Sequence, residues 1–337
     1  MGEMKMKAKF KNPKTALIKA IIIIAVLTVV FCVVAANLLF SFALDRESAL
    51  GMEKMLMKQV TKSSSVGSAQ DYSGFAGTQK DKSWLSQTAK DVYITSQDGL
   101  KLHGLLAENK NSGGKYVIVF HGYSSEASHM KAFMKRFYKM GFSVLAPDAR
   151  THGTSEGRIR GMGWLERKDA LLWADMLIKA NENCKIALFG VSMGGATVMM
   201  TSGEEALPGQ VFACIEDCGY TSAWDEFGFQ LKNMFGLPSF PILNLSSLVT
   251  KMRGGYGFKE ASALEQVKKC KVPMLFIHGE DDSFVPFSML DELYNAAQCN
   301  KRKLVISGAG HAKSSSTDPD TYWKTVEEFL NGCLTEK

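Results

Sequence analysis

The sequence predicts an α/β domain, built on a mostly parallel sheet with helices on both faces, behind one N-terminal transmembrane helix. Three observations lead to this prediction. Residues 20–44 form a run of 25 uncharged, mostly apolar residues. From about residue 84, continuous apolar runs alternate with segments of helical periodicity, which is typical of strands buried on both faces of a parallel sheet. Between about residues 220 and 268 this alternation lapses into a long aromatic-rich stretch.

The N-terminal charge pattern predicts a signal anchor. Residues 1–19 carry six lysines and one glutamate, and residues 20–44 carry no charge. About 20 apolar residues suffice to span a bilayer, and lysines before the span keep the N-terminus in the cytoplasm. We therefore expect a basic cytoplasmic tail (1–19), an uncleaved transmembrane anchor (20–44) in the cell membrane, and the domain that follows on the extracytoplasmic side. The alternative is a cleaved signal peptide, whose apolar region normally has 7–15 residues.

Residues 45–83 are expected to connect the anchor to the domain. Apolar residues near helical spacing in 45–60 fit either a helix on the membrane surface or a solvated connector. Residues 61–83 are rich in Ser, Gly, Gln and Thr, which is linker composition. A flexible linker of about 25 residues has a typical reach of about 25–30 Å. We therefore expect protease to cut this linker and to release a soluble domain.

Residues 84–337 are predicted to form the α/β domain. Residues 91–108 read as two strands around a turn at Asp98-Gly99. Further strands are predicted at 116–122, 142–150, 185–192, 211–219, 272–280 and 302–310, and helices at 125–140, 164–180, 193–202 and 321–330. The stretch at about 220–268 interrupts this alternation, and we interpret it as a helical cap over the carboxyl edge of the sheet.

Ser192 stands in a sequence that is typical of a displayed nucleophile. Residues 186–197, IALFGVSMGGAT, place it between Gly190 and Gly194, after a strand and before a helix. The glycines permit a very sharp turn, and the helix directs its first N–H groups at the site. The pattern G-x-S-x-G recurs at 153–157 around Ser155, but in a polar loop with no adjoining strand. We predict that Ser192 is the nucleophile.

A serine nucleophile needs a base, usually a histidine that a carboxylate orients. On a strand–turn–helix motif the partners follow in the order serine, acid, histidine. Only His278 and His311 follow Ser192. His278 ends an apolar strand, whereas His311 lies in a small-residue loop after the last strand, so we predict His311 as the base. The loop between them, HGEDDSFVP, offers three acids: Glu280, Asp281 and Asp282.

An acyl-transfer site also needs N–H donors for the developing oxyanion. The residue after the nucleophile supplies one, Met193. The loop after an earlier strand supplies the other, and the segment HGY implicates Tyr123.

The segments GVSMGG, FHGY, PDARTHGTSEG, HGEDDSFVP and GAGH together resemble the α/β-hydrolase superfamily. Within it they resemble the branch of serine-aminopeptidase-like, monoacylglycerol-lipase-like and membrane-anchored bacterial esterases, over roughly residues 90–333. In that branch the acid is the D of H-G-x-x-D-x-x-V-P, which implies Asp282. The family implies the same oxyanion pair. Thr151, in DARTHG, stands where glycine is common in the family.

We therefore expect a serine hydrolase that acts on an ester through an acyl-enzyme, with a small-molecule or lipid-like acyl substrate. Aminopeptidase or amidase activity is the second hypothesis, and a non-catalytic surface-binding protein is the third. The sequence has no dinucleotide fingerprint, and the C-x-x-x-C pair Cys214 and Cys218 lacks further zinc-type ligands. We expect no metal and no cofactor. The charge excess of +6 belongs almost entirely to the tail, so no nucleic-acid partner is expected.

Overall fold

A computed structural model describes residues 13–48 and 78–335. Its centre is an eight-stranded sheet of strand order β1-β2-β4-β3-β5-β6-β7-β8. β1 and β4 pair with β2 in antiparallel fashion, and all the other neighbouring strands are parallel. The strands are β1 (Ala89–Thr95), β2 (Lys101–Ala107), β3 (Lys115–Phe120), β4 (Ser143–Pro147), β5 (Lys185–Val191), β6 (Val211–Asp217), β7 (Met274–Gly279) and β8 (Lys301–Ile306).

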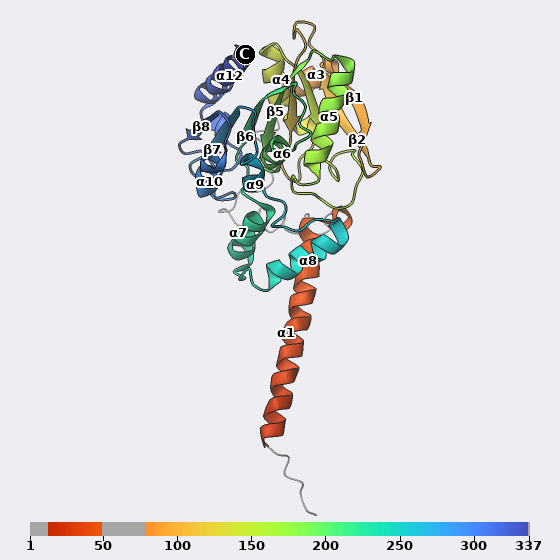
Figure 1. Cartoon of the computed structure of the whole chain (residues 1–337), viewed down its shortest axis with the longest axis vertical. Helices are drawn as coiled ribbons and strands as arrows, with labels where there is room; N and C mark the ends of the chain where they lie inside the picture. The colour runs from red at the N-terminus through yellow and green to blue at the C-terminus, as the bar shows by residue number, and fades with distance from the viewer. Residues whose placement is uncertain (1–12, 49–77, 336–337) are drawn as a thin grey trace, which may run out of the picture.

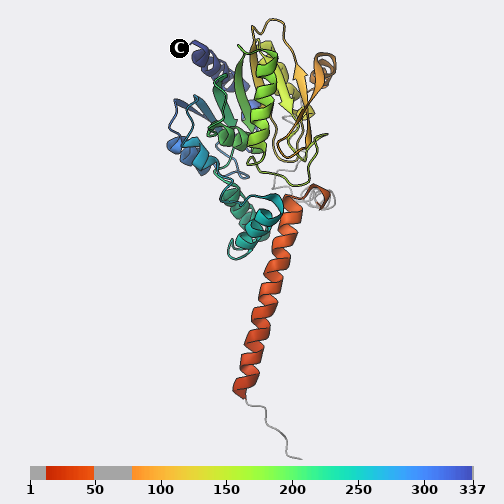
Figure 2. The same ribbon diagram turned by 45° about the vertical axis from the view of Figure 1, so that its right-hand side comes forward.

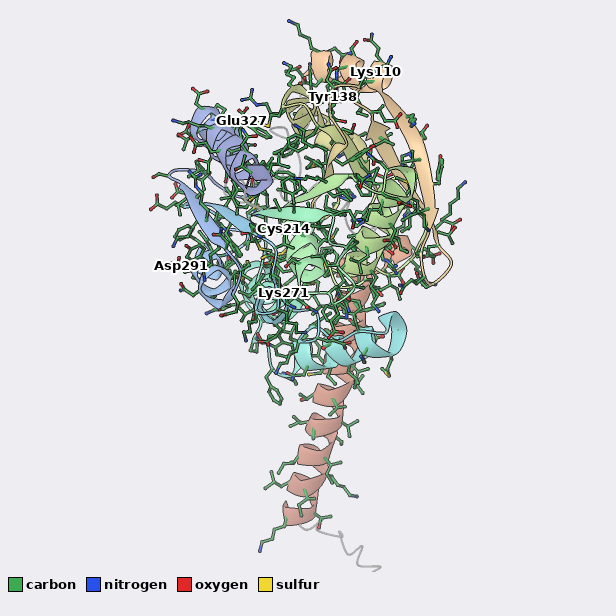
Figure 3. All side chains as sticks on the ribbon, turned by 45° about the horizontal axis from the view of Figure 1, so that its top comes forward. Lys110, Tyr138, Cys214, Lys271, Asp291 and Glu327 are labelled. Atoms are coloured by element: carbon green, nitrogen blue, oxygen red, sulfur yellow. The ribbon has the colours of Figure 1, made fainter. Side chains whose placement is uncertain are left out.

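Helices cover both faces of the sheet (Figure 1), as the continuous apolar strands require. On one face lie α3 (Gln79–Thr88), α4 (Lys131–Lys139) and α12 (Pro319–Thr335). On the other face lie α5 (Glu166–Ala180), α6 (Met193–Ser202), α9 (Ala263–Val267) and α10 (Ser288–Ala296). Cys214, labelled near the middle of Figure 3, is fully buried in β6 between these layers. The predicted α/β-hydrolase architecture is confirmed.

Most predicted elements lie where the sequence placed them, with four differences. The helix expected at 125–140 begins with a short 3-10 helix (Ala127–Met130), and another short helix, α11, spans Ser314–Thr317. The sequence analysis did not predict α10. It also extended the linker to residue 83, which is wrong for residues 79–83. These residues belong to α3, where Thr78 and Asp81 form a capping box that fixes the first turn.

The predicted cap contains two further helices, α7 (Ala223–Phe235) and α8 (Ile242–Gly254). Both lie beyond the sheet, and α8 packs beside the upper end of the N-terminal helix (Figures 1 and 2). Ser222 caps the start of α7 by accepting a hydrogen bond from the Asp225 N–H at its hydroxyl, and Gly236, with a φ of 66°, caps its end. α9, which was assigned to the same stretch, packs instead on α6 over the sheet.

The N-terminal helix α1 spans Pro13–Ala43, and its segment Leu17–Ala43 is long and apolar enough to cross a membrane. Its lower part projects from the domain, with its side chains pointing outward (Figure 3). Its upper end packs against the domain, because Ala36, Phe40 and Leu44 are buried in the core. Residues 49–77, which include most of the expected linker, lie outside the described residues. The expected tethering by the linker alone is nevertheless wrong, because α1 itself docks on the domain.

Candidate active site

Ser192 sits on a very sharp turn between β5 and α6. Its backbone has a φ of 56° and a ψ of −117°, a conformation that non-glycine residues rarely adopt. A Cβ on Gly190 would lie 2.1 Å from the Gly194 carbonyl oxygen, and a Cβ on Gly194 would lie 2.2 Å from the Phe120 carbonyl oxygen. Both positions therefore require glycine, because any side chain would push the turn away from the neighbouring strand and helix.

The structure brings Ser192, His311 and Asp282 together at the carboxyl ends of β5, β7 and β8. The Nε2 of His311 lies 2.9 Å from the Ser192 Oγ. The Nδ1 of the same ring lies 2.7 Å from the Asp282 Oδ2. Serine, histidine and carboxylate thus form one continuous chain of hydrogen bonds, although Ser192 and His311 are 119 positions apart in the sequence.

Asp282 is held rigidly as a buried carboxylate. Its Oδ1 accepts hydrogen bonds from the N–H groups of Phe284 and Val285, both at 2.9 Å. Burial alone would raise the pKa of this carboxyl, but hydrogen bonds from His278 and His311 outweigh burial and hold the pKa well below its usual range. Asp282 therefore stays ionised beside His311.

The other two acids of the loop have different surroundings. Glu280 accepts a hydrogen bond from the Ser307 hydroxyl at 2.6 Å on the exposed side of the loop. Asp281 has an exposed side chain, and its N–H donates to the Ala309 carbonyl oxygen. Of the three candidates from the sequence, only Asp282 has a carboxylate oxygen within hydrogen-bond distance of the ring.

The sequence analysis missed the contribution of His278. Its fully buried ring places Nε2 3.1 Å from the Val285 carbonyl oxygen and 3.3 Å from the Asp282 Oδ2. Asp282 therefore has two histidine partners. The sequence held a signal for this contact, because a histidine at the end of a strand, four residues before the acid, lies close to the loop that carries the acid.

Three more carboxyl groups are buried near this site, and the sequence analysis singled out none of them. Burial raises the pKa of Glu216 to about 8, that of Asp217 to about 6 and that of Glu226 to about 8. Asp217 accepts a hydrogen bond from the Tyr322 hydroxyl at 2.9 Å. Their neutral forms are favoured because each carboxyl group is enclosed by protein.

The predicted oxyanion residues belong to two segments that adjoin the nucleophile. Met193 opens α6, so its N–H belongs to the first turn, where the helix offers no acceptor. A Cβ on Gly122 would lie 3.4 Å from the Ser192 Cβ, which places the loop before Tyr123 directly against the serine. His121 holds this loop, because its Nδ1 lies 2.7 Å from the Gly122 carbonyl oxygen and its Nε2 accepts from the Ala149 N–H at 3.0 Å. Burial lowers the pKa of His121, which keeps the ring neutral.

Ser155, the serine of the second G-x-S-x-G pattern, has a structural environment. Its hydroxyl donates to the Asp148 carbonyl oxygen at 2.8 Å and accepts from the His103 N–H at 2.9 Å. The side chain is buried and both hydrogen-bonding roles of the oxygen are filled. Ser155 therefore stabilises its loop, and its hydroxyl is not exposed as a nucleophile.

Among the described residues, one group of side chains has metal-ligand chemistry: Cys218, Asp282 and His311, with ligand atoms within 4.8 Å of one another. Two of the three are the residues joined to Ser192. Burial, together with nearby carboxylates, raises the pKa of the Cys218 thiol well above its usual value, so the thiol is neutral. A neutral thiol is a poor ligand, and the arrangement suits proton transfer better than metal binding.

Comparisons with known proteins agree with the fold. A family model described as serine aminopeptidase, S33, matches residues 113–215. The uncharacterized protein YqkD of Bacillus subtilis is 32% identical over 216 residues, which cover 64% of this chain and 70% of that protein. The α/β hydrolase domain-containing protein WAV2 of Arabidopsis thaliana is 26% identical over 264 residues, covering 75% of this chain and 82% of WAV2.

A solved structure is similar over the whole domain. The esterase Pf2001 of Pyrococcus furiosus superposes with a TM-score of 0.59 at 27% identity, covering 76% of this chain and 95% of the esterase. Fold, sequence relatives and family model agree, and the chain belongs to the α/β-hydrolase superfamily, as a hydrolase similar to the S33 serine aminopeptidases.

Proposed function

We propose that the chain is a membrane-anchored serine hydrolase that cleaves carboxylic esters of apolar or lipid-like acyl groups. Ser192 attacks the carbonyl carbon while His311 takes the hydroxyl proton, and Asp282 stabilises the imidazolium. His311 then gives that proton to the leaving alcohol, which leaves an acyl-enzyme on Ser192. Water attacks the acyl group with His311 again as base, and the carboxylic acid departs.

The hydrogen-bond chain from Ser192 to Asp282 is the observation that supports this proposal most. Because Asp282 is an ionised acceptor 2.7 Å from the His311 Nδ1, the ring proton resides on Nδ1. Nε2 is then the acceptor for the Ser192 hydroxyl proton, at 2.9 Å. The backbone N–H groups of Met193 and Tyr123 would bind the developing oxyanion.

The dimensions of α1 support a membrane location. Its 27-residue apolar segment, Leu17–Ala43, is about 40 Å long at 1.5 Å per residue, against about 30 Å for the hydrocarbon core. About 20 residues from Leu17 complete the crossing and reach Ala36, the first residue of α1 that belongs to the buried core of the domain. The lysines before the span favour a cytoplasmic N-terminus and a catalytic domain outside.

The exposed surface of the cap supports an apolar substrate. Phe240 precedes α8 and is 76% exposed, while Leu248 and Met252 lie one helical turn apart on α8 and are 54% and 70% exposed. α8 also packs beside the upper end of α1, so these side chains lie at the depth of the outer interface. Apolar side chains at that depth favour contact with lipid, and an acyl chain could enter the site from the bilayer.

Aminopeptidase activity is the second candidate, and the description of the matching family model favours it. Ester and amide hydrolysis use the same nucleophile, base and oxyanion donors, so the site geometry does not separate them. A comparison of ester and amide substrates separates the two activities.

Purified full-length protein in detergent should be assayed with aryl esters of increasing acyl length and, in parallel, with aminoacyl amides. We expect turnover of the esters, with a rising kcat/KM as the chain lengthens, and loss of turnover in Ser192→Ala. Faster cleavage of the aminoacyl amides would replace the esterase proposal with the second candidate. Undiminished hydrolysis by Ser192→Ala would contradict both.

A further inference from the structure

The end of α1 contacts the loop that holds a proposed oxyanion donor. The Tyr123 hydroxyl donates a hydrogen bond to the Ala43 carbonyl oxygen at 2.6 Å. Ala43 is the last residue of α1, and the last carbonyl groups of a helix lack partners within the helix. The side chain of Tyr123 thus satisfies the end of the membrane helix, while its backbone follows Gly122, which lies against Ser192.

Arg160 reinforces this contact. Its guanidinium lies 4.7 Å from the centre of the Tyr123 ring, and its Nη1 lies 3.3 Å from the Tyr123 hydroxyl and 3.4 Å from the Ala43 carbonyl oxygen. The Tyr256 hydroxyl donates to the Arg160 carbonyl oxygen at 2.7 Å. Because Arg160 is itself buried, the tyrosine ring and the helix end are held by one desolvated cation.

The segment after α1 is fixed to the same loop region by backbone pairing and charge. The Arg160 N–H donates to the Leu44 carbonyl oxygen at 2.9 Å, and the Arg46 N–H donates to the Arg158 carbonyl oxygen at 2.8 Å. The Arg46 guanidinium donates to two carbonyl oxygens of the loop at 153–155, at 2.7 and 2.9 Å. Arg158 forms a bidentate contact with the buried carboxylate of Asp45, at 2.9 and 3.1 Å.

Apolar packing holds the helix from its other side. Ala36 and Phe40 of α1 and Leu44 just after it are spaced by four residues, so they lie on one side of the helix, and all three are buried. Arg253 of α8 donates to the Asn37 side-chain oxygen at 2.9 Å, and its guanidinium lies 5.1 Å from the centre of the Phe40 ring. The upper end of α1 is therefore enclosed between the cap and the loop of Tyr123.

We infer that the end of α1 is a positioning element of the catalytic centre: it holds the Tyr123 side chain and thereby fixes the backbone N–H of Tyr123 beside Ser192. This inference rests on the proposed function. An oxyanion donor acts only when its N–H lies about 2.7–3.1 Å from the developing charge. A loop anchored on one side by His121 and on the other by α1 meets that requirement without reorganising during the reaction. The membrane helix is then needed for turnover as well as for localisation.

The direct test is Tyr123→Phe in the full-length protein. This change removes the hydroxyl that reaches Ala43 and leaves the ring and the backbone N–H in place. Loss of one complete oxyanion donor lowers kcat by about 10²–10³-fold, and we expect a displaced donor to lower kcat about tenfold or more. KM for a short aryl ester should change less than about twofold. Affinity for an aryl boronate, whose tetrahedral adduct occupies the oxyanion site, should fall in parallel with kcat.

Tyr220→Phe is the matched control. Tyr220 is a buried tyrosine of this domain, and its hydroxyl, like that of Tyr123, donates to a backbone carbonyl oxygen, that of Met162, at 3.1 Å. Its loss should lower thermal stability to a similar extent and leave kcat unchanged. A general structural weakening would instead lower kcat equally in both variants, and that result would overturn the inference.

A second set of variants loosens the helix without touching Tyr123. Phe40→Ala combined with Arg46→Gln removes a buried ring and two hydrogen bonds from the end of α1. We expect a loss of kcat similar to that of Tyr123→Phe, and little further loss when all three changes are combined, because both routes release the same loop. Multiplicative losses, or full kcat in Tyr123→Phe, would overturn the inference. Activity of Ser192→Ala separately tests the proposed function, so the two failures are distinguishable.

Discussion

Asp282→Asn tests the orientation of the base, and the structure specifies how the change should act. The Asp282 Oδ1 accepts two backbone N–H groups, so the remaining oxygen of asparagine will occupy that position. The amide nitrogen is then directed at the His311 Nδ1, which has to become an acceptor. The ring proton therefore moves to Nε2, where it faces the Ser192 hydroxyl and prevents the histidine from taking the serine proton.

The expected loss is about 10⁴-fold in kcat, as for the corresponding change in other serine hydrolases with this arrangement. This corresponds to about 5.5 kcal/mol of transition-state stabilisation. Asp281→Asn is the matched control, because its side chain is exposed in the same loop, and its kcat should stay within about threefold. Both variants should be assayed with one aryl ester at saturating concentration. Equal losses, or a larger loss for Asp281→Asn, would refute the role given to Asp282.

Three further results follow from the structure. Gly194→Ala should abolish activity or folded yield, because its Cβ would lie 2.2 Å from a carbonyl oxygen, whereas Gly195→Ala, with 3.2 Å to its nearest atom, should be milder in both assays. Glu216 has a folded-state pKa of about 8 against 4.5 when unperturbed, so its stability contribution is complete below pH 4.5 and is lost as pH rises to about 8. Glu216→Gln should therefore raise the melting temperature in detergent more at pH 8.5 than at pH 5, and an equal shift at both would contradict this. A protease site introduced at residues 61–77 and cut on intact cells should leave the domain on the membrane, because α1 stays docked. Release on cutting would contradict the docking, and resistance until permeabilisation would contradict the external orientation.

The sheet and the candidate triad were predictable because their signals are local. The central strands β3 to β7 are short, mostly apolar runs, and Ser192, Asp282 and His311 each follow a strand at the edge where parallel strands end. The departure from the family pattern at Thr151 is likewise explained by local backbone conformation. Its φ of 71° lies in the left-handed region that favours glycine, which is the residue common at this place in the family.

The docking of α1 could not be predicted from the sequence. Its buried face at Ala36, Phe40 and Leu44 lies in a segment where every face is apolar, so periodicity cannot mark the side that packs on protein. The contact between Tyr123 and Ala43 joins residues 80 positions apart through a side-chain hydroxyl and a backbone carbonyl. Such a pair depends on where the cap and the loops fold. His278 was missed for a different reason: it was weighed only as an alternative base, although its position four residues before Asp282 is a local signal for their contact.

Covalent labelling with a fluorophosphonate probe tests the central claim most directly, because the probe reacts with a serine that a neighbouring base has activated. Full-length protein should be labelled in membranes, digested, and mapped by mass spectrometry. We expect the phosphonyl group on Ser192, loss of labelling in Ser192→Ala, and retained labelling in Ser155→Ala, where only a buried structural hydroxyl is removed. Labelling that persists in Ser192→Ala, or that maps to Ser155, would contradict the assignment of the nucleophile.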